Sequence, residues 1–336
     1  MLAPSSPLPV KGPDAATIAR RALVALALAG AAAVALVLAG RPARAIGDAL
    51  DRALHADARW VAAAAGFEVL SFAGYVVLLW LVTGRATPRM DLRASVQVTL
   101  GGAAATRLMP TGGVGGAALT LWILRRTGLD ARRAGRTLLT FLVLLYAVFL
   151  ASIAVSGALL AAGVGAVRGP LGLTAVPAAL ATAGILVPLG LGLAHREDAV
   201  PATGRVRSLA RLLGAAVHDA LGLARRADPR LLGALAWWTF DAAVLWAMLD
   251  AFGAAVPFAV VVLAYFVGQA GNLVPVPGAV SGGIAGVLLA FGVDADLALV
   301  SVLGYRAVAI WLPAPFGLLA LGALRHTVAR WAPAAA

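Results

Sequence analysis

Long windows of apolar residues with few or no charges recur along this chain and limit what it can fold into. At about 1.5 Å per residue, a window of about 20 residues forms enough helix to cross a hydrocarbon core of about 30 Å. Hydrophobic residues make up 62% of the chain and charged residues only 12%, more apolar surface than a water-soluble fold can bury. Alanine and leucine dominate without strand-type alternation, so we predict an all-α polytopic membrane protein.

Six of the windows are long enough for full transmembrane helices. They are Ala22–Gly40, Trp60–Val82, Thr137–Gly163, Leu171–Ala194, Leu231–Phe252 and Leu297–Leu324. Two further apolar regions, 94–124 and 257–291, are broken near the middle by "MPTGG" and "NLVPVPGAVSGG". Each half has only about 15 to 18 residues, which is short for an untilted span. We predict two re-entrant helical hairpins, whose tips mark an internal cavity because broken backbone at membrane depth must be covered by protein or water.

The order of these segments predicts an internal repeat, because two spans, a broken hairpin and another span occur twice. Gly128-Leu129-Asp130-Ala131 after the first hairpin matches Gly292-Val293-Asp294-Ala295 after the second, and Pro110 matches Pro275. Three crossings per unit place the second unit upside down, as in many secondary transporters. The alternative is a chance likeness of apolar, glycine-rich segments. The expected domains are an N-terminal tail (1–19), a first repeat (20–163), a second repeat (164–324) with an amphipathic segment (199–230), and a C-terminal tail (325–336).

The positive charges gather in alternate loops and thereby predict the orientation of the chain. Arginine and lysine accumulate in loops that stay in the cytoplasm, which places both termini there, in a bacterial-type cytoplasmic membrane. This test does not distinguish re-entrant hairpins from pairs of crossings. The basic connection 199–230 predicts an amphipathic helix on the anionic inner leaflet. Nucleic-acid binding is not expected, because the arginines are distributed as membrane-side anchors rather than gathered in one basic domain.

Three stretches resemble a known family. The stretches "LMPTGGVGG", "VPVPGAVSGGIAGVLLAFGVDADLALVSVLGYR" and "WWTFDAAVLW" are similar to motifs of flippase-like membrane proteins related to the transmembrane domain of lysylphosphatidylglycerol synthase. Where that family usually carries a glutamate, this chain has Ile284, Ala285 and Gly286. The aminoacyl-transferase domain is not expected here, because the chain ends shortly after its last span. The resemblance implies movement of a phospholipid or lipid-linked anion between leaflets.

The hairpin tips are the expected substrate site. Helices that start after Pro110 and Pro277 would point free N–H groups into the cavity and favour an anion; the alternative is that the glycines only allow close helix packing. Arg107 and Arg306 would hold a lipid phosphate by forked hydrogen bonds. The residues expected to line the site are Arg107, Pro110, Thr111, Gly112, Gly113, Gln269, Asn272, Pro275, Pro277, Gly278, Ser281, Tyr305 and Arg306.

Two carboxylates at membrane depth complete the expected site. Glu68 and Asp241 would act as counter-ions or proton carriers, since a charge near the bilayer centre is costly and is usually paired or functional. The alternative is that the two acids and two arginines form buried ion pairs that only fix helix packing.

Three classes of function remain open. The first is a flippase-like lipid transporter, the second a secondary transporter of a small soluble solute, and the third a membrane-embedded enzyme or assembly partner. The sequence shows no nucleophile–base pair and no nucleotide loop, so we expect no enzyme and no cofactor. The chain has no cysteine and its four histidines lie far apart, so no metal site is expected. The expected partners are anionic membrane lipids, and homo-oligomerisation stays open.

Overall fold

The computed structural model describes residues 56–108, 114–164, 169–195, 204–273 and 278–331, and all regular structure in these ranges is helical. The prediction of an all-helical fold is therefore confirmed. Five segments within these ranges are long and apolar enough to cross a membrane: Ala58–Ala86, Ala131–Ala162, Ala175–Leu193, Pro229–Ala251 and Ala295–Trp331. The expected first span, Ala22–Gly40, lies outside the described residues. The chain is thus a multi-pass membrane protein.

The long segments follow the predicted spans closely, with one difference at the last of them. They comprise α3 (Ala58–Ala86), α6 (Ala131–Ala162), α7 (Ala175–Leu193), the short 3₁₀ turn η1 (Pro229–Leu231) with α9 (Leu232–Ala251), α12 (Ala295–Trp311) and α13 (Ala314–Trp331). The span expected at Leu297–Leu324 is two helices in series, because Pro313 and Pro315 lack the N–H groups that would continue the hydrogen-bond ladder. Helix α13 continues to Trp331, so most of the expected C-terminal tail is helical.

The two interrupted regions each form a pair of short, packed helices. Helices α4 (Leu92–Leu108) and α5 (Val114–Arg126) form one pair, and α10 (Phe258–Gln269), the 3₁₀ turn η2 (Ala270–Leu273) and α11 (Ala279–Ala290) form the other. Glycines let the backbones touch at both crossings. A Cβ atom on Gly102 would lie 3.4 Å from the Cα of Gly116, and one on Gly283 would lie 2.9 Å from the Cα of Gly268.

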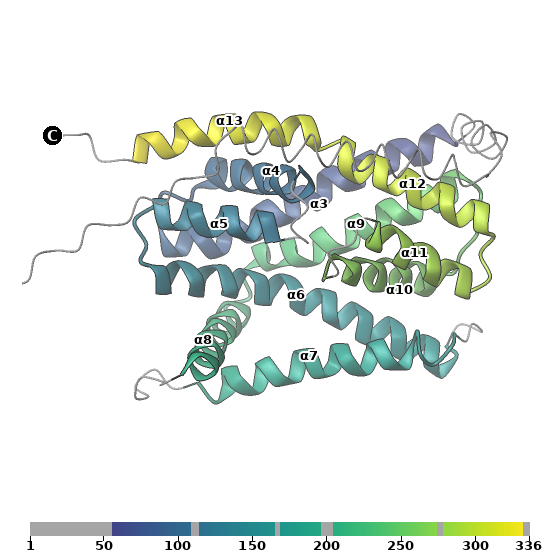
Figure 1. Cartoon of the computed structure of the whole chain (residues 1–336), viewed down its shortest axis with the longest axis horizontal. Helices are drawn as coiled ribbons and strands as arrows, with labels where there is room; N and C mark the ends of the chain where they lie inside the picture. Colours follow the sequence, from purple (N-terminus) through teal and green to yellow (C-terminus); the bar gives the residue numbers. More distant parts are fainter. Residues whose placement is uncertain (1–55, 109–113, 165–168, 196–203, 274–277, 332–336) are drawn as a thin grey trace, which may run out of the picture.

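Figure 1 shows how the helices are arranged around α6, which runs along the length of the bundle. The α4–α5 pair lies at one end beside α13, and the α10–α11 pair lies at the other end beside α12. Helix α10 begins near the end of α6 and has 12 residues, whereas α6 has 32. At about 1.5 Å per residue, α10 therefore ends less than halfway along α6.

Helices α3 and α9 cross in antiparallel orientation at the centre of the molecule. The hydroxyl of Ser71 donates a hydrogen bond of 2.9 Å to the carbonyl oxygen of Trp237. On either side of this bond, Phe67 stacks on Phe240 at 6.0 Å and Gly74 meets Gly233. Successive contacts advance along α3 while they move back along α9, as expected for antiparallel helices. These paired contacts define the register of the crossing.

The two "Gly-x-Asp-Ala" stretches that match in the sequence also have matching structures. Gly128 and Gly292 adopt positive φ angles of 95° and 82°, a conformation that glycine reaches without a steric cost. Asp130 then accepts the backbone N–H of Arg133 at the start of α6, and Asp294 accepts that of Asp296 at the start of α12. Each stretch ends a short helix and caps the next long one.

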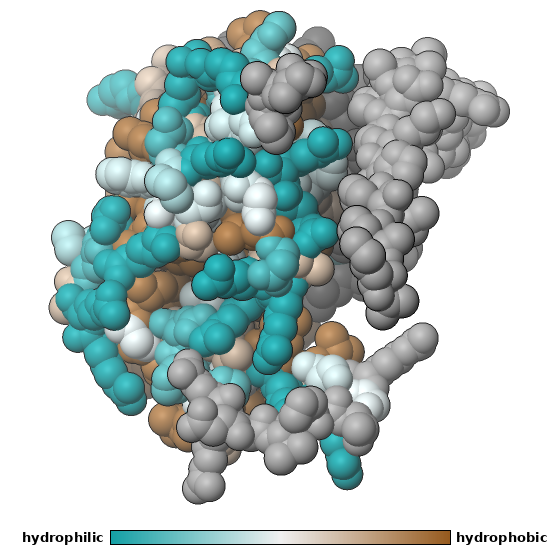
Figure 2. Space-filling model, turned by 90° about the vertical axis from the view of Figure 1, so that its left-hand side faces the viewer, coloured by the Kyte–Doolittle hydropathy of each residue, from teal (hydrophilic) through white to brown (hydrophobic). Residues whose placement is uncertain are grey.

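The ends of the bundle differ in charge, and two names are used for them below. The acidic end carries the α9–α10 and α11–α12 turns with Asp250, Asp294 and Asp296, whereas the basic end lies opposite. The basic end, which faces the viewer in Figure 2, gathers hydrophilic side chains. Among the arginines in the turns and helix termini of this end are Arg85, Arg89, Arg125, Arg126, Arg132, Arg133, Arg225, Arg226 and Arg230.

A helix lies within the basic connection for which the sequence predicts an amphipathic segment. Helix α8 (Arg205–Arg225) packs on α6 and α7. Its Asp219 accepts two hydrogen bonds of 2.6 Å from the Arg136 guanidinium of α6, a bidentate pair that holds α8 in place. Leu209, on the same helix, is exposed.

Candidate functional site

Polar side chains form a layer at one depth in the apolar bundle. Four of them lie 10 or 11 residues in from the acidic end of their own helices: Glu68 on α3, Asp241 on α9, Gln269 on α10 and Tyr305 on α12. These helix ends lie together. The backbone N–H of Asp57 donates to the carbonyl oxygen of Ala251, and the α9–α10 and α11–α12 turns line one surface pocket. The polar layer therefore lies about 15 Å from these helix ends, a distance equal to half of a hydrocarbon core of about 30 Å.

Asp241 is the hydrogen-bond acceptor at the centre of this layer. Its side chain is 8% exposed, and those of Tyr265 and Tyr305 are 0% and 1% exposed. The Tyr265 hydroxyl donates a short hydrogen bond to one carboxylate oxygen. The Tyr305 hydroxyl lies 3.4 Å from both carboxylate oxygens, a longer, shared contact. Burying a carboxylate is costly unless donors reach it, so these hydroxyls stabilise the charged form.

Two amides extend the network from Tyr305 to the surface. The Gln269 side-chain amide donates to the Tyr305 hydroxyl at 2.8 Å, and the Asn272 amide donates to the Gln269 oxygen at 2.9 Å. Asn272 is exposed although it lies one turn past Gln269, at the end of a helix that stops within the bundle. An exposed polar group at membrane depth is tolerated where it lines a water-filled cavity. The network thus leads from the exposed Asn272 into the protein core.

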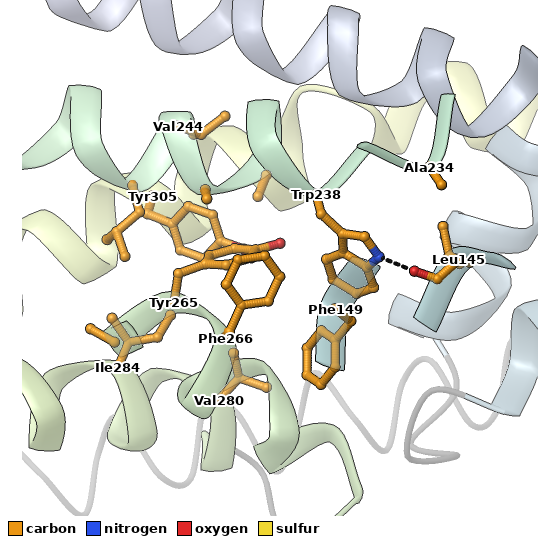
Figure 3. Close-up of a cluster of buried hydrophobic side chains, with 14 of the residues drawn as sticks. Leu145, Phe149, Ala234, Trp238, Val244, Tyr265, Phe266, Val280, Ile284 and Tyr305 are labelled. Atoms are coloured by element: carbon orange, nitrogen blue, oxygen red, sulfur yellow. Dashed lines mark hydrogen bonds between the residues drawn. The ribbon is translucent and has the colours of Figure 1, made fainter. Parts of the chain in front are cut away.

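An aromatic cluster fixes the position of the two tyrosines. Figure 3 shows Trp238, one turn before Asp241, donating its indole N–H to the carbonyl oxygen of Leu145 on α6 at 2.7 Å. Phe266 packs edge-to-face on Tyr265 with ring centroids 4.9 Å apart, and it also contacts Trp238. This packing leaves Tyr265 and Tyr305 little freedom to turn away from the carboxylate.

The structure brings only part of the expected site together. It joins Asp241, Gln269, Asn272 and Tyr305 in one hydrogen-bonded chain. Glu68 is buried on α3, and the α3–α9 register places it within about half a turn of the level of Asp241. Gly278 precedes α11 with a φ of 82°, and Ser281 is half-buried in the first turn of that helix.

Both hairpin tips fall partly outside the described residues. Pro110, Thr111, Gly112, Gly113, Pro275 and Pro277 lie outside the described residues. The backbone of Arg107 belongs to α4, but its side chain is also outside them. Arg306 follows Tyr305 on α12, is half-buried, and forms no ion pair with any residue that the structure describes.

The sequence analysis did not identify two residues that form hydrogen bonds in these regions, Tyr265 and Thr106. Tyr265 precedes Gln269 by four residues, so both side chains lie on one face of α10. A tyrosine four residues before a glutamine in an otherwise apolar helix was the signal that could have found it. Thr106 accepts the backbone N–H of Gly116 at 2.8 Å and so ties α4 to α5. Its sequence context gives no such signal.

These features define a multi-pass helical membrane protein with a hydrogen-bonded polar layer inside the helical bundle. The chain belongs to the lysylphosphatidylglycerol synthase TM region family, whose model matches residues 22–317. The family resemblance seen in the sequence motifs is therefore confirmed. A comparison with curated proteins gave no match.

Proposed function

We propose that this protein is a flippase-like transporter that moves an anionic phospholipid, or another lipid-linked anion, between leaflets without changing it chemically. The observation that carries the proposal is the polar layer around Asp241, which opens at the exposed Asn272. A carboxylate and exposed amides among apolar helices are costly, and such groups are usually paired or functional. Membership of a family named for the membrane region of a lipid-modifying synthase favours a lipid substrate.

An inverted repeat would supply the two-sided access that transport requires. The helix contacts are equivalent in the two halves when α3 is matched with α9, α4 with α10, α5 with α11, and α6 with α12 and α13 together. For example, α4 packs on α13 in the same way that α10 packs on α6. A shift of 166 or 167 residues relates Gly102 to Gly268 and Gly116 to Gly283, the crossing glycines of the two hairpins. The antiparallel α3–α9 crossing then lies at the pseudo-two-fold axis. We infer that the units are inverted repeats and that both hairpins are re-entrant.

In this proposal the phosphate is held between the two hairpins. Arg306 follows Tyr305 of the polar layer on α12, and Arg107 lies 15 residues, or about 22 Å, from the start of α4 at the opposite end. An arginine at this depth that forms no ion pair with the described residues favours an anion as its partner. The helix start of α11 would add N–H donors. Glu68 and Asp241 would balance the arginine charges when the site is empty.

The charged ends give the proposed orientation. The basic end would face the cytoplasm, with both termini, because arginine-rich loops are retained there. Helix α8 and its arginines would then lie on the anionic inner leaflet. The α10–α11 hairpin would enter from the outer face and the α4–α5 hairpin from the cytoplasm.

Leaflet exchange of fluorescent lipids in proteoliposomes tests the proposal. We expect wild-type protein to accelerate exchange of phosphatidylglycerol more than of phosphatidylcholine, and Arg306→Ala to lose that acceleration. Arg325→Ala is the matched control, because it removes the same charge from an exposed position near the basic end of α13. Equal loss in both variants would contradict a phosphate site at Arg306. No exchange above empty vesicles would overturn the lipid proposal and favour a soluble solute.

A further inference from the structure

The hydrogen bonds that link Asn272, Gln269 and the two tyrosines to Asp241 point the same way. Asn272 donates to Gln269, Gln269 donates to Tyr305, and both tyrosine hydroxyls donate to the carboxylate. A carboxylate accepts hydrogen bonds at both oxygens, whereas its protonated form carries a donor of its own. This convergent arrangement therefore fits an ionised Asp241. On protonation, the carboxyl loses its charge and one of its oxygens gains a hydrogen, so the hydrogen bonds from the two hydroxyls are weakened.

The charged and titratable groups around Asp241 come from each helix that packs on α9. Helix α3 contributes Glu68, α10 contributes Tyr265, and α12 contributes Tyr305, which Arg306 follows in the sequence. On α6, Tyr146 faces Trp238 rather than Asp241, at 5.9 Å between ring centroids, and Arg136 is bound to Asp219. At η1, Arg230 is bound to Asp228.

We propose that Asp241 binds a proton, and that this proton is linked to substrate binding through Tyr305, Gln269 and Asn272. The inference rests on the proposed function, and it identifies a proton as the ion whose binding is linked to that of the lipid. The only covalent change is an O–H bond formed on the Asp241 carboxylate by a proton from cavity water. The same change removes the charge that orients Tyr305, so it loosens the chain that holds the end of α10 and η2.

The charge of the lipid headgroup determines whether its binding takes up or releases a proton. An anionic headgroup bound near Asp241 disfavours a second negative charge and so favours the protonated carboxyl. Lipid binding should then take up as much as one proton per chain. Because linkage is reciprocal, lower pH should tighten binding of the anionic lipid, by up to about tenfold per pH unit.

The test measures lipid binding and proton uptake separately in the purified full chain. Phosphatidylglycerol in detergent is added to weakly buffered protein, proton uptake is followed with a pH indicator, and binding is followed by native mass spectrometry across a range of pH. We expect wild-type protein to take up protons and Asp241→Asn to bind lipid without uptake and without pH dependence. Asp250→Asn is the matched control, because it neutralises a carboxylate on the same helix nine residues away and should keep the uptake.

A second variant covers the case in which Asp241→Asn fails to fold. Tyr265→Phe keeps the carboxylate and the ring but removes one hydroxyl donor, so the midpoint of the pH dependence should move upward. Lipid binding without proton uptake, or with equal uptake in Asp241→Asn, would overturn the linkage and leave the transport proposal standing. An unmoved midpoint in Tyr265→Phe would likewise overturn it. If phosphatidylglycerol does not bind at any pH, the lipid proposal fails and the linkage fails with it.

Discussion

Gly74 of α3 and Gly233 of α9 face each other where the two helices cross. A Cβ atom on Gly74 would lie 2.7 Å from the carbonyl oxygen of Gly233 and 2.8 Å from the backbone nitrogen of Trp237. Both are backbone atoms, which cannot turn aside. We therefore expect Gly74→Val to force the helices apart and to lower the free energy of unfolding by about 1–3 kcal/mol. Thermal unfolding in detergent measures this loss.

Gly66 offers a control on the same helix. A Cβ atom there would meet nothing within 4 Å, so Gly66→Val adds the same side chain without a clash. If the two variants unfold at the same temperature, the close approach of α3 and α9 does not limit stability.

The crossing of α10 and α11 gives a second paired prediction. A Cβ atom on Gly283 would lie 2.9 Å from the Cα of Gly268, whereas one on Gly282 would meet nothing within 4 Å. Gly283→Ala should destabilise the protein by about 1–3 kcal/mol through overpacking. Gly282→Ala should be neutral or stabilise it by as much as about 1 kcal/mol, because alanine is the better helix former. Melting temperatures that fall equally in both variants would contradict the described contact.

The sequence was sufficient for much of the fold because apolar length is a strong signal in a membrane protein. The helices α3, α6, α7 and α9 lie where windows of low charge predicted them. The division of the last span between α12 and α13 depends on Pro313, whose effect on a helix varies with its surroundings. Hydropathy alone therefore predicted one span there.

The site was less predictable, because its parts meet only through tertiary packing. Asp241 stood out as a charge inside an apolar span, and Gln269 and Asn272 preceded a proline-rich break. Tyr265 looked like an ordinary core aromatic, and only the packing of α10 on α9 brings its hydroxyl to Asp241. No pattern within one helix could reveal that contact.

Acid stability tests the cluster at the start of η1. Asp228 accepts side-chain hydrogen bonds from Arg230, at 2.8 and 3.0 Å, and one from Arg85. The bonds from Arg230 hold the pKa of Asp228 well below its usual value. The charged carboxylate therefore stabilises the fold above the unfolded pKa of about 4, and this contribution is lost as pH falls below it.

The variant Asp228→Asn should therefore be less stable than wild type at pH 7. The difference in melting temperature should shrink as pH falls below about 4. Arg230→Gln removes the main hydrogen-bond donor to Asp228. In this background, the difference in melting temperature that Asp228→Asn causes at pH 7 should be smaller than in the wild-type background. A difference between wild type and Asp228→Asn that stays constant from pH 7 to pH 3 would contradict the predicted role of the charge.

The depth of Asn272 distinguishes a re-entrant hairpin from a pair of crossings. The chain has no cysteine, so single substitutions give one labelling site each. Ala255 is exposed at the acidic end and Arg325 near the basic end, and cysteines there should each react with an impermeant maleimide from one face only. A cysteine in place of Asn272 should react more slowly than both, because a re-entrant α10 ends at half depth. If α10 instead crosses the membrane, Asn272→Cys will react as fast as Arg325→Cys and from the same face.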